Sequence, residues 1–176
     1  MTSMSASPSK PPVPASPALD RLLQAVAAAA TKSGVFGPVE VRAASGSSPA
    51  MLVCEAQNSA APAEYRLFVD GGKVYVALVT ADRWLSQSIE AQLFHLGDKL
   101  EELLEEDLYD QGYERGTLPI EHFRSEDKLY TFRSPLPIEL RAADTSESIT
   151  TATQCLLGYE GCFRRLGDMD AGDEED

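Results

Sequence analysis

The sequence contains no hydrophobic run long enough to cross a membrane as a helix. Such a helix needs about 20 consecutive apolar residues, and no stretch of the 176 residues approaches that length. The first residues also lack the basic region followed by a hydrophobic run that marks a secretory signal. We therefore expect a soluble protein that stays in the cytoplasm and does not insert into a membrane.

Basic side chains are scarce. The chain has 15 Lys and Arg residues against 28 Asp and Glu residues, which gives a net charge of −13. A negative field of this size opposes approach to nucleic acid or to anionic lipid. The charge balance therefore excludes nucleic acid as a partner and favours protein partners, including clients or regulators with basic segments.

Cysteine is rare, and none of the spacings forms a Cys-x-x-Cys pair. Cys54 stands alone, while Cys155 and Cys162 lie seven residues apart within a predicted helix. That spacing separates them by about 10 Å along the helix axis, beyond the roughly 7 Å between Cα atoms that a disulfide tolerates. We expect three reduced thiols that are buried as small hydrophobic side chains.

Motifs that carry catalysis are also missing. The segment 46–49 lacks the second glycine of a Gly-x-Ser-x-Gly nucleophile turn, and 70–73 joins two strands without the rest of a phosphate-binding loop. His95 and His122 with the three cysteines show no zinc-ligand spacing, and the carboxylates of 101–107 form a solvated helix face. We expect no catalytic residues, no cofactor and no metal.

The clearest positive signal is a tight hairpin that leads into an amphipathic helix. Alternating residues 65–69 and the apolar run 74–79 flank Asp-Gly-Gly-Lys at 70–73, which is typical of a two-residue turn. The period then becomes helical, and Asp82 is the expected N-cap, with Ser86 as the alternative boundary one turn later. The apolar stripe of this helix is Leu85, Ile89, Leu93, Leu96, Leu100, Leu103 and Leu104. We predict one continuous helix, in which Leu85 to Leu108 span about 35 Å.

The other elements follow from local signals. Ser16 and Pro17 predict the start of a first helix that ends at about Lys32 with Gly34 as its stop. Strands are predicted at 35–41, at 51–56, and in a second hairpin at 118–123 and 129–132. Asp144 with Glu147 predicts the start of a last helix, which runs to about Leu166.

These elements define a single α+β domain. Residues 1–16 are rich in Pro and Ser and are expected to be a disordered leader, residues 17–167 form the domain, and residues 168–176 are an acidic mobile tail. We expect an antiparallel curved sheet of about five strands with helices packed on it, in the order α-β-β-β-α-β-β-α. Trp84, in the first turn of the long helix, is expected to pack between helix and sheet.

This order of elements, with the small size and strong acidity, resembles the type III secretion chaperone-like fold, which also includes the bacterial YbjN-like proteins. The resemblance covers roughly Leu19 to Leu166. It implies a curved antiparallel sheet backed by helices, a homodimer, and binding of other proteins without catalysis. Chaperones of this kind hold an extended segment against apolar patches and strand edges.

Two functional hypotheses follow. The first is a non-enzymatic, homodimeric protein-binding module of the chaperone or adaptor kind, which uses the outward face of the sheet and the helical stripe. The proposed partner or dimer seam is Leu85, Ile89, Leu93, Leu96, Leu100 and Leu103. The alternative is a small enzyme in which Cys54, Cys155 or Cys162 is the nucleophile and His95 or His122 the base. A cysteine sulfur hydrogen-bonded to an imidazole in a pocket would favour the enzyme.

Overall fold

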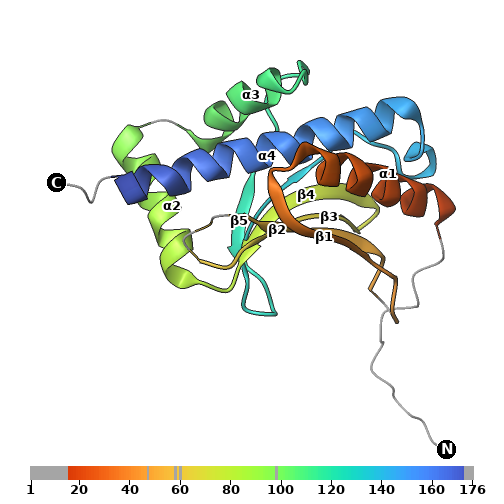
Figure 1. Ribbon diagram of the computed structural model, residues 1–176, viewed down its shortest axis with the longest axis horizontal. Coiled ribbons are helices and arrows are strands. Elements are labelled where there is room, and N and C mark those ends of the chain that lie inside the picture. The colour runs from red at the N-terminus through yellow and green to blue at the C-terminus, as the bar shows by residue number, and fades with distance from the viewer. Residues whose placement is uncertain (1–15, 47, 58, 60, 98, 173–176) are drawn as a thin grey trace, which may run out of the picture.

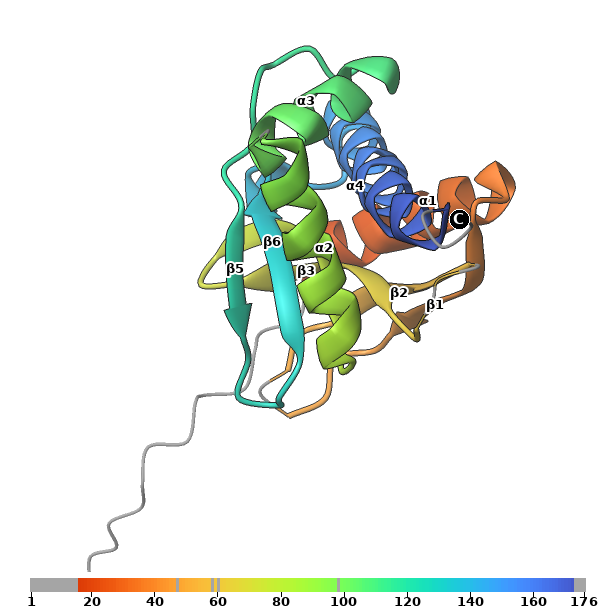
Figure 2. The ribbon, with the colours of Figure 1, turned by 90° about the vertical axis from the view of Figure 1, so that its left-hand side faces the viewer.

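A computed structural model shows a six-stranded antiparallel sheet with the helices gathered on one of its faces (Figures 1 and 2). It describes residues 16–46, 48–57, 59, 61–97 and 99–172, with the backbone alone for Leu96 and for 167–172. The predicted α+β class is confirmed. The predicted leader, apart from Ser16, and the last four residues of the predicted tail lie outside the described residues.

The first helix and the first two strands form one side of the domain. Helix α1 (Pro17–Ser33) begins where the Ser16 hydroxyl accepts a hydrogen bond from the Leu19 N–H, and it ends before Gly34, as predicted. Strand β1 (Phe36–Arg42) forms one edge of the sheet, and its register with β2 (Met51–Ala56) shifts at Gly37–Pro38. The apolar stripe of α1 packs on this pair and consists of Leu19, Leu22, Leu23, Val26 and Ala30.

The predicted central hairpin is confirmed. Strands β3 (Glu64–Asp70) and β4 (Lys73–Thr80) pair from Glu64 opposite Val79 to Asp70 opposite Lys73, and both glycines of the turn have positive φ. Strand β4 is buried on both faces from Val74 to Thr80. Its helix-side residues belong to the main core, and its other side forms the floor of the sheet's open face.

The predicted single long helix is wrong, because the chain breaks at Gly97. Helix α2 (Arg83–Leu96) starts at the predicted N-cap Asp82 and stops where Gly97 takes a φ of 74°. Helix α3 (Leu100–Asp110) then starts afresh in a new direction (Figure 1). Glycine adopts this left-handed conformation without the steric penalty of a Cβ, so it terminates a helix even within an apolar stripe.

The second hairpin and the last helix complete the fold. Strands β5 (Glu121–Arg124) and β6 (Tyr130–Pro135) extend the sheet, and the strand order is β1-β2-β3-β4-β6-β5. The sheet has six strands where about five were expected, and four of them lie between α1 and α2, where three or four were expected. A short 3₁₀ turn (Leu140–Ala142) leads into helix α4 (Ser146–Gly172).

Helix α4 differs from its prediction at both ends. The Thr145 hydroxyl, and not Asp144, accepts the capping hydrogen bond from the Ser148 N–H, because Asp144 instead pairs with Arg21 of α1 at 2.7 Å. The helix also continues to Gly172, past the predicted end, so the predicted tail begins as helix. Within α4, Gly158 faces Leu108 of α3 so closely that an added Cβ would lie 2.7 Å from Leu108 Cδ2.

Candidate protein-binding surface

The structure places most of the predicted leucine seam against the protein's own core. Leu85, Ile89 and Leu103 are buried within the single chain, while Leu93 and Leu100 are half-buried. The side chain of Leu96 lies outside the described residues. The stripe therefore holds α2 and α3 on the rest of the domain, and little of it faces outward.

The structure keeps the candidate cysteines apart from the candidate histidines. His95 is exposed on α2. His122 stacks on Phe132 with ring centres 3.9 Å apart, and its ring nitrogens lie 3.1 Å from the Thr131 carbonyl oxygen and 2.7 Å from the Glu90 carboxylate. Throughout the part of the chain that the structure describes, no cysteine sulfur is hydrogen-bonded to an imidazole.

All three cysteines are free and buried, as predicted. Burial raises the thiol pKa of Cys54, Cys155 and Cys162 from 9.0 to about 12. Because the thiolate is the nucleophile, all three are held in their unreactive form at neutral pH. Folding therefore protects these side chains and does not activate them.

The native protein is expected to react very slowly with a thiol reagent at pH 8. Once the protein is unfolded in guanidinium chloride, three thiols per chain are expected to react. The raised pKa also implies that these thiols stabilise the fold fully below pH 9 and lose that contribution as pH rises from 9 towards 12. Thiol titration in the presence and absence of denaturant measures the first effect. Rapid labelling of one thiol in the folded protein would show a reactive cysteine.

The face of the sheet opposite the helices carries a row of arginine, aromatic and small side chains. Strand alternation places these residues there, and the register brings Arg66 of β3 and Arg133 of β6 to opposite sides of Ala77 of β4. Ala77 and Val79 are buried, although none of the helices in the described residues lies on this side, because neighbouring long side chains cover them. The other apolar residues of this face are Met51, Val53, Phe68, Tyr75 and Phe123.

Arg133 is the centre of this open face. Its Cζ lies 4.1 Å from the ring centre of Tyr75 and 5.1 Å from that of Phe123. Its Nη1 donates to Asp70 at 2.9 Å and its Nε donates to Glu121 at 2.7 Å. Burial lowers the pKa of Arg133, but the hydrogen bonds to these two carboxylates outweigh that effect and raise it. The guanidinium is therefore fixed and fully charged. It links β6 to β3 and β5 through the two carboxylates and packs on the two aromatic rings.

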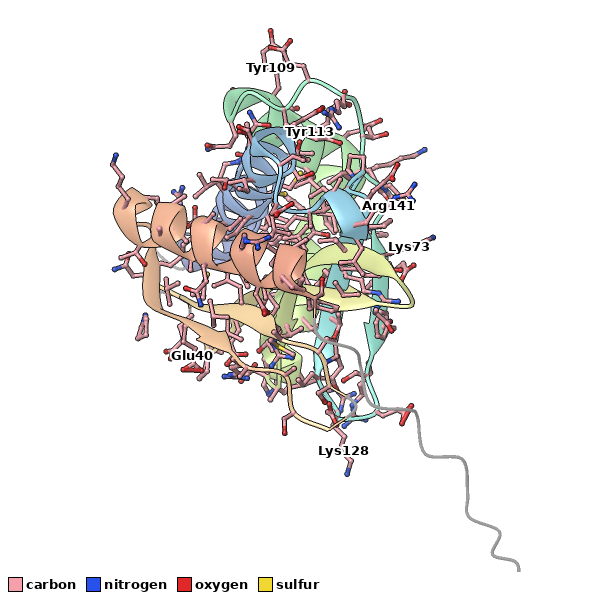
Figure 3. All side chains as sticks on the ribbon, turned by 90° about the vertical axis from the view of Figure 1, so that its right-hand side faces the viewer. Glu40, Lys73, Tyr109, Tyr113, Lys128 and Arg141 are labelled. Carbon is pink, nitrogen blue, oxygen red and sulfur yellow. The ribbon has the colours of Figure 1, made fainter. Side chains whose placement is uncertain are left out.

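A groove of about 580 Å³ runs over this surface. The groove residues come from β2, β3, β4, the β5–β6 hairpin and its turn, and they are Met51, Arg66, Phe68, Asp70, Val79, Phe123, Arg124, Ser125, Glu126, Asp127, Leu129, Thr131 and Arg133. Strands β2 and β5 both line it although three strands separate them in the sheet, so the sheet bends towards this side. Figure 3 shows Lys128 at the tip of the β5–β6 hairpin, at one end of the open side.

The groove combines apolar surface with two arginines, Arg66 and Arg133, whose charges are already paired. Arg66 donates to Glu64 at 2.8 Å, and Arg133 is bound by Asp70 and Glu121. Phe123 remains 38% exposed at the mouth. A ligand therefore meets aromatic and aliphatic surface rimmed by polar groups, which is typical of a surface that receives a segment of another protein.

The sequence indicated the outward sheet face but not these residues as a group. Alternation within each strand shows which side chains share a face. Only the register shows that Phe68, Tyr75, Arg133 and Phe123 meet, because they come from four different strands.

No helix within the described part of the chain is both long enough and apolar enough to span a membrane. The described residues also include no cluster of three or more His, Cys, Asp or Glu side chains arranged to hold a metal ion. No protein-family model matches the chain, and the searches of curated proteins and of solved structures also gave no match.

Proposed function

We propose that this protein is a non-catalytic protein-binding module of the chaperone or adaptor kind, which acts in the cytoplasm and self-associates as a homodimer. Its client is a segment of another protein, held in the groove on the open face of the sheet. The observation that carries the proposal is this groove, in which the partly exposed ring of Phe123 lies against a charge-paired arginine. The resemblance of the element order to the secretion chaperone-like and YbjN-like folds agrees with such a role.

The chemistry of the groove and of the whole chain defines the client. Phe68, Phe123 and Leu129 offer apolar contacts, so the bound segment needs at least one large apolar or aromatic side chain. The chain as a whole has a charge of −13, so basic residues beside that anchor accelerate association. The cysteine-dependent alternative requires a thiol hydrogen-bonded to His95 or His122, and among the described residues the hydrogen bonds of His122 go to Thr131 and Glu90 instead.

A displayed library of random peptides, selected on the full-length protein, tests this proposal. Selected peptides are expected to combine an apolar anchor with flanking basic residues. Phe123→Ser is expected to weaken their binding by about tenfold or more, because truncating an aromatic hot spot costs about 2 kcal/mol or more and a tenfold change corresponds to about 1.4 kcal/mol. Tyr109→Ser is the matched control, since Tyr109 is also an exposed aromatic but projects from α3, far from the hairpin tip marked by Lys128 (Figure 3).

Salt provides an independent readout. The association rate with a selected basic peptide is expected to fall as ionic strength rises to 0.15 M, where the Debye length is about 8 Å. Binding to the groove is contradicted if no peptide is enriched, or if the two variants bind the selected peptides equally well.

A further inference from the structure

Helix α2 has a second apolar stripe, which faces away from the protein. Trp84 is 74% exposed and Phe94 is 90% exposed, so the predicted packing of Trp84 between helix and sheet is wrong. Gln87 and Ala91 lie between them and are exposed as well. The four residues follow one another at intervals of three, four and three, which places them on one side of the helix. Figure 2 shows α2 in front of the sheet with its outer side uncovered.

We propose that this outer stripe, formed by Trp84, Gln87, Ala91 and Phe94, pairs with the same stripe of a second copy in an antiparallel helix contact. This inference deepens the proposed self-association and does not depend on the groove. The contact uses a different side of α2 from the predicted leucine seam, because Leu85 and Ile89 of that seam are buried in the core of their own chain.

The spacing of the stripe is self-complementary under a two-fold axis. In an antiparallel pair the residue numbers that face each other have a constant sum, and Trp84 with Phe94 and Gln87 with Ala91 have the same sum. One register therefore places Trp84 of each copy on Phe94 of the other, at both ends of the contact. Ala91 is small, so the two helices can approach closely at the centre.

The charge of this surface also favours a second copy. Two chains with a net charge of −13 repel each other, so they meet most easily where their surfaces are locally neutral. Beside this stripe α2 carries Arg83, and Glu90, the one carboxylate within α2, already contacts His122 of β5 at 2.7 Å. Helix α3, by contrast, carries six carboxylates and no basic residue.

The contact area is that of a weak, transient interface. Each buried aromatic side chain contributes about 150–250 Å², so the four aromatic residues of a dimer supply roughly 600–1,000 Å² between them. The flanking residues of the two helices bring the total near the low end of the standard 1,200–2,000 Å² range. A dimer of about micromolar affinity is therefore expected.

Sedimentation equilibrium of the full-length protein from about 0.1 to 100 µM, a range that brackets this affinity, tests the inference. The wild type is expected to convert from monomer to dimer within it. The double variant Trp84→Glu/Phe94→Glu is expected to weaken the dimer by at least about 100-fold, because each substitution acts twice in a two-fold interface and introduces like charges. Tyr109→Glu, an equally drastic change at an exposed aromatic on α3, is expected to leave the dimer unchanged.

Cross-linking tests the register separately and keeps both aromatic residues. The native cysteines are buried, so a double variant Gln87→Cys/Ala91→Cys adds the only exposed thiols among the described residues. Mild oxidation is expected to give a covalent dimer. Arg83→Cys alone is expected to give no covalent dimer, because an antiparallel pair sets its two copies about 18 Å apart along the axis. Efficient cross-linking of Arg83→Cys would instead indicate a parallel pair and overturn the register.

The outcomes separate this inference from the proposed function. A dimer that survives both glutamate substitutions overturns the α2 contact but leaves self-association standing. A wild-type protein that stays monomeric throughout the concentration range overturns both. Neither result changes what is expected for peptide binding in the groove.

Discussion

Leu108→Ala is expected to lower the free energy of unfolding by about 2–5 kcal/mol, the range found for fully buried leucines. Leu108 of α3 is completely buried and packs against Gly158 of α4, where the two helices come closest. Its removal leaves a cavity between two helices that can close only if their backbones move together. The loss is therefore expected to lie above that of a half-buried leucine such as Leu93.

Substitution of Gly158, which lies against Leu108, tests the same helix contact from the other side. Gly158→Ala would place a methyl group 2.7 Å from Leu108 Cδ2 and 3.4 Å from Leu108 Cα. Overpacking of this kind costs about 1–3 kcal/mol, which outweighs the roughly 1 kcal/mol that alanine gains over glycine within a helix. In the double variant the new methyl group fills part of the space that Leu108 vacates, so the combined loss is expected to be smaller than the sum.

Urea denaturation of the two single variants and the double variant measures this coupling. Tyr109→Ala serves as the control because it removes a larger side chain from the next position on the same helix, but one that is 64% exposed. Its effect is expected to stay within about 0.5 kcal/mol. Strictly additive losses would mean that Leu108 and Gly158 do not limit the approach of α3 to α4.

Tyr159→Phe is expected to cost about 1–3 kcal/mol, although it removes a single oxygen atom. The Tyr159 hydroxyl lies 2.5 Å from the Ser134 hydroxyl, and both residues are fully buried between α4 and β6. Burial raises the pKa of Tyr159, so its phenol stays protonated and available for this bond. The substitution leaves the Ser134 hydroxyl buried without its partner, and that desolvation causes the loss.

Substituting Ser134, the partner of Tyr159, distinguishes the loss of the hydrogen bond from a loss of packing. Ser134→Ala alone is expected to be destabilising because it leaves the Tyr159 hydroxyl without its partner, whereas Ser134→Ala with Tyr159→Phe removes both polar groups. The double variant is therefore expected to be more stable than the sum of the single losses predicts. Equal and additive effects in thermal unfolding would show that the two hydroxyl groups act independently.

The structure differs from the sequence-based predictions at Gly97 and at Trp84. The apolar period continues through Gly97, so the pattern predicted one helix although a single glycine was enough to end it. Trp84 was expected to be packed because large aromatics usually are. Its neighbour Leu85 is the one that faces the core, and a rotation of one residue around a helix turns a side chain by about 100°.

The sequence by itself determined the elements whose cause is local. The Ser16 and Asp82 caps, the stop at Gly34 and the Asp-Gly-Gly-Lys turn involve residues within a few positions of one another, so their geometry follows from nearby atoms. The tertiary structure alone decided that β6 lies between β4 and β5, that Arg133 meets Tyr75 and Phe123, and that the outer stripe of α2 stays uncovered. These features arise from contacts between residues far apart in the chain, and no local pattern specifies which strands pair or which helix faces remain free.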